Sequence, residues 1–162
     1  MSFPASHLCF DNALLDALSA AAVAAPRLRS HRNLHTSIEE PVQRLLIGIE
    51  PGSYVVPHRH LRPGYDETLL ILRGSLGVLV FDDDGRVRET MRLVAGGSQT
   101  GYHLPSPTWH SVCALQPGTV CFEVKPGPYR PLADGERAPW APAESDAGTA
   151  AFLDGMLACF RD

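Results

Sequence analysis

The chain has 162 residues, of which 44% are hydrophobic and 20% are charged, a composition typical of one soluble globular domain. Its formal net charge is −4 and its arginines form no basic run, which excludes the clustered positive charge that nucleic-acid binding requires. The four cysteines contain no CxxC pair, so free thiols in a reducing cytoplasm are expected, although one bridge between Cys113 and Cys121 stays open.

Residues 1–40 are expected to form a helix followed by an irregular arm. Asp11 can cap a helix over residues 12–25, whose apolar residues recur at helical spacing, and Pro26 ends it. No Lys or Arg precedes this apolar stretch, and it is too short and too polar to span a bilayer. The sequence therefore predicts a cytoplasmic protein with no membrane partner.

Residues 41–126 change to a pattern of short strands. Eight segments rich in β-branched and aromatic residues are separated by turn residues such as Pro51-Gly52, Gly74 and Pro117-Gly118. No helix long enough for a parallel crossover lies between them, so an all-β antiparallel sandwich or barrel is predicted. The predicted strands cover residues 42–50, 54–60, 67–73, 75–81, 86–93, 98–104, 110–115 and 119–125.

Residues 127–162 complete the same single domain. A loop with several prolines is expected up to about residue 146. A second amphipathic helix follows at about residues 147–161, with aromatic and aliphatic residues at helical spacing. Both terminal helices are expected to pack outside the barrel or to form an oligomer interface.

Four side chains are spaced as metal ligands. His58 and His60 are two residues apart, so on a strand they project to one face, and the next strand returns antiparallel and brings Glu67 beside them. His110 begins a later strand and can complete the set from across a closed barrel. Burying these groups without a cation would leave polar atoms unpaired, at about 1–3 kcal/mol each. The sequence therefore predicts one divalent ion bound by His58, His60, Glu67 and His110.

Two segments resemble the two sequence motifs of the cupin superfamily. The second segment matches at Pro105 and His110 but has Pro107 where a glycine is usual. In the first segment, the gap of six residues from His60 to Glu67 is longer than usual. The resemblance implies a single-domain cupin, a double-stranded β-helix or jelly-roll barrel, with flanking N- and C-terminal helices. The first segment matches at its glycines, its His-x-His pair and its glutamate, which are Gly52, His58, His60, Glu67 and Gly74.

Further segments resemble the WbuC family of cupin-fold metalloproteins over about residues 26–144. That family takes its name from a gene found in bacterial O-antigen clusters, so the resemblance implies a context of surface-polysaccharide biosynthesis. Because cupins commonly dimerise, it also implies a homodimer. The segments that carry it are RNLH at 32–35, PVQRL at 41–45, PHRH at 57–60, FD at 81–82, WH at 109–110, EVKPGPY at 123–129 and WAP at 140–142.

Glu123 and Lys125 alternate with Phe122 and Val124, so one of these pairs faces the barrel interior and the other faces outward. If Glu123 lies inside the cavity, it is a candidate catalytic acid or base, with Lys125 as a candidate substrate-binding residue. If the two lie outside, they form a solvated charge pair. The sequence leaves both interpretations open.

Five more residues are candidates for contact with a small-molecule ligand, for which a sugar is one candidate class. His35 lies in the irregular arm, which could cross the barrel mouth. Arg44 and Arg59 could bind an anionic group, although ordinary surface exposure explains them equally well. Tyr54 and Tyr102 could line a sugar-binding mouth, but packing within the barrel is the simpler explanation.

The ligand set does not choose among Fe, Mn, Ni, Co and Zn. An octahedral ion would keep two open positions, whereas tetrahedral Zn would be filled. An open position allows Lewis-acid action on a carbonyl or hydroxyl group, as in a sugar or nucleotide-sugar isomerase or epimerase, or oxygen binding, as in a dioxygenase. A non-enzymatic metal- or carbohydrate-binding module and a structural metal in a protein-interaction domain stay open as alternatives.

Overall fold

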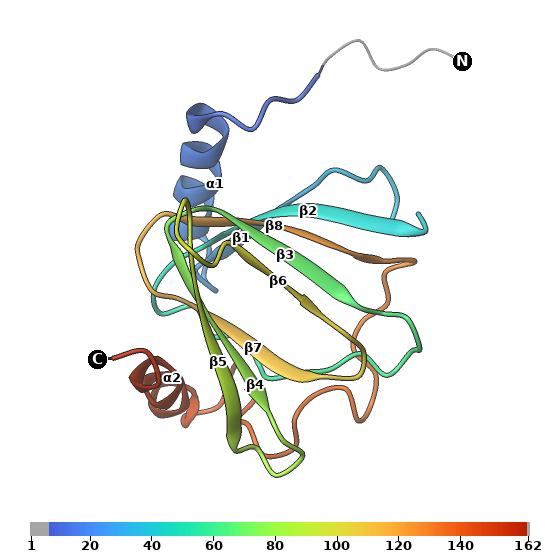
Figure 1. Cartoon of the computed structure of the whole chain (residues 1–162), viewed down its shortest axis with the longest axis vertical. Coiled ribbons are helices and arrows are strands. Elements are labelled where there is room, and N and C mark those ends of the chain that lie inside the picture. The colour runs from blue at the N-terminus through green and yellow to red at the C-terminus, as the bar shows by residue number, and fades with distance from the viewer. Residues whose placement is uncertain (1–6, 162) are drawn as a thin grey trace.

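The computed structural model describes residues 7–161 as two β-sheets flanked by two helices (Figure 1), so residues 1–6 of the expected N-terminal part lie outside the described residues. No helix within residues 7–161 has the length and apolar character needed to cross a membrane. The elements in chain order are α1 (Asn12–Ala24), β1 (Arg29–Asn33), β2 (Val42–Ile49), β3 (Glu67–Arg73), β4 (Ser75–Phe81), β5 (Val87–Val94), β6 (Gly101–Leu104), β7 (Trp109–Ala114), β8 (Thr119–Pro126) and α2 (Thr149–Ala158).

The strands form two antiparallel sheets that face each other across an apolar core. The larger sheet has the order β1-β2-β8-β3-β6, and the smaller sheet has the order β5-β4-β7. Every strand pair within residues 7–161 is antiparallel, as the sequence predicts, because short turns connect most of these strands. The core between the sheets is built from aliphatic side chains of both, including Ile49, Leu69, Ile71, Leu76, Val78, Val80 and Leu93.

The two helices cover the outer faces of the sheets (Figure 1). The side chain of Asp11 accepts a hydrogen bond from the Leu14 backbone N–H at 2.9 Å, so it caps α1 as the sequence predicts. Leu14 and Leu18 of α1 pack against Leu46 on β2. On the other side of the molecule, apolar residues of α2 pack against the smaller sheet. Each helix therefore closes one apolar sheet face, and the space between the sheets is left for the site.

Two sequence predictions need correction. The arm over residues 27–40 was expected to be irregular, but residues 29–33 form β1, which pairs with β2 at the sheet edge. The predicted strand over residues 54–60 is not a strand: it makes isolated bridges only, at His58. Pro57 has no N–H to donate, which interrupts a regular hydrogen-bond ladder at this point.

All four cysteines are free thiols, which excludes the bridge between Cys113 and Cys121 that the sequence left open. Both of these thiols are buried, whereas Cys9 and Cys159 are exposed. The two interior thiols act as small apolar groups in the packing of the sheets.

Candidate metal centre and cavity

The strand register aligns one row of side chains across the whole larger sheet. Asn33 pairs with Leu45, Leu45 with Glu123, Glu123 with Leu69, and Leu69 with Tyr102. Directly paired residues of antiparallel strands point to the same face of a sheet. All five line one cavity of about 570 Å³, so the larger sheet presents this row to the cavity.

A second row crosses the facing wall of the cavity. The backbones of His58 and His110 exchange two hydrogen bonds, at 3.0 and 2.9 Å. The same His58 also forms a β-bridge with Arg137, on its other side. The extended segment around residue 58 is therefore held between β7 and the late loop, and His110, His58 and Arg137 share one face.

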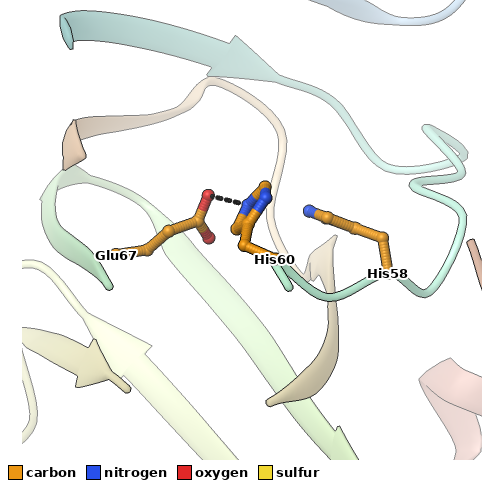
Figure 2. Close-up of side chains that lie close together, drawn as sticks. All are labelled: His58, His60 and Glu67. Carbon is orange, nitrogen blue, oxygen red and sulfur yellow. Dashed lines mark hydrogen bonds and ion pairs between the residues drawn. The ribbon is translucent and has the colours of Figure 1, made fainter. Parts of the chain in front are cut away.

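The four predicted ligand residues converge at this end of the cavity. The Nε2 atom of His60 lies 2.9 Å from Oε1 of Glu67, and the Nε2 atom of His110 lies 2.8 Å from Oε2 of the same carboxylate. One ligand atom from each of His58, His60 and Glu67 lies within 4.8 Å of the others. Figure 2 shows these three side chains directed toward a common centre, and the ring centroid of His110 is 4.4 Å from that of His58.

Backbone carbonyls hold the outer nitrogens of two of these rings. The Nδ1 atom of His58 lies 3.0 Å from the carbonyl oxygen of Val56, and that of His110 lies 2.8 Å from the carbonyl oxygen of Thr108. Since a carbonyl only accepts, Nδ1 carries the hydrogen and Nε2 is left to act as a ligand.

The contacts of the His110 ring bear on whether these four side chains fit a metal ion. Both ring nitrogens of His110 face acceptors, because Nδ1 lies against a carbonyl and Nε2 lies against the Glu67 carboxylate. A doubly protonated His110 ring, a protonated Glu67 carboxyl group or a bound cation would each reconcile the two contacts. Three imidazoles and one carboxylate are a common ligand set for divalent transition metals, so the residues present fit the ion.

The electrostatics of the cluster favour the metal-binding protonation states of Glu67 and His58, whereas Glu67 favours the protonated form of His110 in the metal-free chain. Burial alone would raise the pKa of Glu67, but hydrogen bonds with His110 and His60 and the charge of Lys125 hold it well below its usual range. Burial lowers the pKa of His58 to about 3, and the nearby His110 adds to the effect. Burial also pulls the pKa of His110 down, but the contact with Glu67 outweighs it and the pKa is raised. An ionised Glu67 and a neutral His58 are the forms that bind metals.

Glu123 and Lys125 lie inside the cavity, beside the cluster. The Nζ atom of Lys125 lies 2.8 Å from Oε1 of Glu123 and 3.2 Å from Oε1 of Glu67. Burial raises the pKa of Glu123, although the charge of Lys125 opposes the rise. Burial alone would lower the pKa of Lys125, but the two carboxylates raise it. Lys125 thus joins Glu123 to the predicted ligand Glu67 in one buried network.

Tyr102 and His35 also line the cavity, at different depths. Tyr102 is 8% exposed, and its burial raises its pKa well above the usual value. His35 lies on the arm, where its Nδ1 atom is 3.1 Å from the backbone nitrogen of Arg44. The Arg44 side chain is outside the cavity lining and forms an ion pair with Glu40 at 3.0 Å.

Tyr54 and Arg59 are not brought to the cavity. The hydroxyl of Tyr54 donates to the carbonyl oxygen of Pro142 at 2.9 Å, within the layer between the smaller sheet and α2. Arg59 points to the opposite side from its neighbours in the His-x-His pair, because successive side chains alternate along an extended segment. Its guanidinium stacks on Trp109, 4.2 Å from the ring centroid, and lies 3.5 Å from Asp83.

Among the basic residues of the cavity wall that sequence reasoning missed are Arg29, His31 and Arg137. Arg29 and His31 pair with Ile49 and Ile47 of β2, so they share the cavity face of the larger sheet. The alternation of basic residues beside the RNLH segment was a usable signal for β1. No local signal marks Arg137, because its position depends on pairing with a distant segment.

The family described as "Domain of unknown function (DUF6016)" matches residues 10–93, which is 84 of the 162 residues. The chain belongs to the DUF6016 family. The matched part contains His58, His60 and Glu67 and ends before the strands that carry His110 and Glu123. A comparison with curated proteins found no match.

Solved structures similar to this DUF6016 chain show its fold. The structure of KdgF from Halomonas sp. is 19% identical, with 65% of this chain and 84% of that chain covered and a TM-score of 0.51. The salicylate 1,2-dioxygenase of Pseudoaminobacter salicylatoxidans, in complex with gentisate, is 12% identical, with 74% and 33% covered and a TM-score of 0.55. A cupin superfamily protein from Desulfitobacterium hafniense DCB-2 is 17% identical, with 60% and 76% covered and a TM-score of 0.47. The chain has a cupin-like fold of two antiparallel sheets with flanking helices, which confirms the predicted fold class.

Proposed function

We propose that this DUF6016 protein is a metal-dependent enzyme that acts on a small molecule. It holds one divalent cation through His58, His60, Glu67 and His110. The observation that carries the proposal is the convergence of three imidazoles and one carboxylate at the wall of a cavity of about 570 Å³. Four protein ligands leave two open positions on octahedral Fe, Mn, Ni or Co, whereas tetrahedral Zn would be filled.

The preferred reaction is isomerisation or epimerisation of a sugar or nucleotide sugar. A divalent ion bound here would supply Lewis-acid polarisation of a carbonyl or hydroxyl oxygen. Glu123 takes a proton from the substrate and returns it at a neighbouring position, since its buried carboxyl group has a raised pKa. Lys125 holds that carboxyl group in place through its contact at 2.8 Å.

The resemblance of residues 32–35, 57–60 and 123–129 to the WbuC family supports the choice of sugar chemistry. It also supports surface-polysaccharide biosynthesis as the proposed context of the reaction. A cytoplasmic homodimer is part of the same proposal, and light scattering of the purified protein tests the oligomeric state.

A cupin dioxygenase is the second candidate. The cavity lining also includes aliphatic side chains, which favour a substrate with an apolar or aromatic part; they are Leu45, Ile47, Leu69 and Val112. An open metal position would then bind oxygen instead of a sugar hydroxyl group.

Metal analysis tests the centre itself. Protein purified without chelators is expected to contain close to one divalent ion per chain. The double variant His58→Ala with His60→Ala should lose the ion. His103→Ala is the matched control, because His103 is exposed on β6, where its ring nitrogens lie beside Thr68 and Asp66. Equal metal content in all three proteins would contradict the proposed centre.

A reaction screen tests the chemistry. Protein loaded with Fe, Mn, Ni or Zn is incubated with nucleotide sugars and keto-sugars, and conversion is followed by NMR. Oxygen uptake with aromatic acids tests the dioxygenase. Conversion that Glu123→Gln abolishes, with the metal retained, supports the isomerase. A metal-loaded protein without turnover in either arm would favour a binding module.

A further inference from the structure

Arg137 lies beside the proposed metal ligands although the sequence places it in the proline-rich loop. The backbone N–H of Arg59 donates to the carbonyl oxygen of Glu136 at 2.9 Å, and that of Ala138 donates to the carbonyl oxygen of Pro57 at 3.0 Å. These bonds set Arg137 directly opposite His58 in an antiparallel bridge. Paired side chains of such a bridge share a face, and both residues line the cavity.

Three other arginines of the cavity lining already have carboxylate partners. Arg27 and Arg29 contact the same oxygen of Glu144, at 2.6 and 2.5 Å. Arg130 forms two hydrogen bonds with the carboxylate of Glu39, at 2.8 and 2.9 Å. Each of these guanidinium groups therefore has a carboxylate partner, although Arg27 and Arg29 share one.

Arg137 differs from them. Within residues 7–161 no carboxylate oxygen lies within 4.0 Å of its guanidinium, whose Nη1 donates to the carbonyl oxygen of Leu132 at 2.9 Å. The adjacent Glu136 is occupied otherwise, since its two oxygens accept from the backbone N–H groups of Leu61 and Ala133 at 2.8 Å each. Arg137 is exposed and keeps free N–H donors at the cavity mouth.

The net charge of the cavity lining also favours an anionic ligand. The lining contains two more cationic than anionic side chains, whereas the whole chain has a net charge of −4. A bound divalent ion would add to this local excess, so the cavity attracts anions. The cationic residues are Arg27, Arg29, Lys125, Arg130 and Arg137, and the anionic residues are Glu67, Glu123 and Glu144.

We propose that Arg137 binds the carboxylate of an anionic substrate whose neighbouring oxygen lies at the metal centre, a role that rests on the metal centre proposed above. A planar guanidinium matches a carboxylate through two parallel hydrogen bonds. The pairing of Arg137 with His58 puts both residues on the same wall of the cavity, so the proposed substrate carries its carboxylate beside the oxygen that binds at the centre. The substrate class is therefore a 2-hydroxy acid, which includes the acidic sugars.

Binding of simple probes tests this role without any assumption about turnover. Lactate is titrated into Mn(II)-loaded protein by calorimetry, with 1,2-propanediol as its neutral analogue and inorganic phosphate as a second anion. The proteins are the wild type, Arg137→Gln, Arg137→Lys and Arg88→Gln. Arg88 is the matched control, because it is an exposed arginine on β5 and is not part of the cavity lining.

We expect lactate to bind the wild type, and Arg137→Gln to weaken it about 10- to 100-fold through loss of a charge-assisted contact. Arg137→Lys should lie between the two, Arg88→Gln should match the wild type, and propanediol should bind weakly to all four. Equal lactate affinity in the wild type and Arg137→Gln overturns the role. The role is also overturned if the metal-loaded wild type does not bind lactate. It is overturned as well if the protein binds phosphate instead of lactate and this binding depends on Arg137.

The manganese content of each protein separates this inference from the proposed function. Arg137→Gln is expected to retain the metal, since it removes no ligand. If the wild type binds no metal, the proposed centre is wrong. If the wild type binds metal but has the same lactate affinity as Arg137→Gln, only the carboxylate site is wrong.

Discussion

The carboxylate of Glu67 and the imidazole of His110 meet at 2.8 Å across the space between the two sheets. Glu67 begins β3 of the larger sheet, and His110 lies on β7 of the smaller one. They are only 3% and 4% exposed. The contact therefore ties the sheets together with two buried polar groups. Removal of Glu67 takes away the partner of the His110 Nε2 atom, whereas removal of His110 leaves Glu67 in contact with His60 and Lys125.

Removal of His110 should lower the metal affinity of a protein that stays folded. His110→Ala removes a proposed ligand, so we expect the loss to exceed the roughly 10- to 100-fold that loss of a group behind a ligand causes. Competition with a chromophoric chelator measures the dissociation constant, and near-ultraviolet circular dichroism checks the fold. An affinity within a factor of about 2 of the wild type, when His103→Ala is also unchanged, would exclude His110 as a ligand.

The free energy of unfolding of the metal-free protein should fall as the pH is lowered between the unfolded-state and folded-state pKa values of His58. Burial lowers the pKa of His58 in the folded chain to about 3, whereas in the unfolded chain it returns to about 6.5. Between these values the unfolded state binds the extra proton, so the free energy of unfolding rises with pH and is lost as the pH falls from about 6.5 toward 3.

Urea unfolding in the presence of a chelator, at several pH values between 7 and 4, measures this dependence. His58→Gln removes the titrating ring, so its unfolding free energy should depend less steeply on pH than that of the wild type. If the free energies of unfolding of the two proteins depend on pH with the same slope, His58 is protonated equally in the folded and unfolded states.

Thiol reactivity should divide the four cysteines into two pairs. Burial raises the pKa of Cys113 to about 12, and burial raises that of Cys121 as well, so neither forms the reactive thiolate near neutral pH. Cys9 and Cys159 are exposed. Ellman's reagent at pH 8 should therefore titrate two thiols in the native protein and four in denaturant, and Cys9→Ser should lower both counts by one. Rapid reaction of all four native thiols would contradict the buried positions.

Two glycine substitutions should change stability in opposite directions. A Cβ atom on Gly48 would lie 2.6 Å from the carbonyl oxygen of Leu18 in α1, so Gly48→Ala pushes the helix off the sheet and should destabilise by about 1–3 kcal/mol. Gly155 lies inside α2 with no atom within 4 Å of the added carbon. Gly155→Ala should therefore stabilise by about 0.5–1 kcal/mol. Chemical denaturation measures both, and a destabilised Gly155→Ala would show that α2 is packed differently.

Local features of the sequence determined the strands, the capped first helix and the His-x-His pair. Alternation of apolar residues, turn glycines and the side chain of Asp11 act over a few residues, so they can be interpreted without a tertiary structure. The spacing of His58 and His60 is also local, and Glu67 follows within the next strand. For these reasons the cupin fold and the candidate ligands could be predicted together.

Only the tertiary structure decided which side chains reach the cavity. Glu123 and Phe122 are neighbours on β8, and the register with β2 and β3 turns Glu123 inward. The pairing of Arg137 with His58 joins segments far apart in the chain, and no local pattern encodes it. The physical reason is that a strand's own sequence limits its two faces, whereas hydrogen bonding to distant segments chooses the face that points inward.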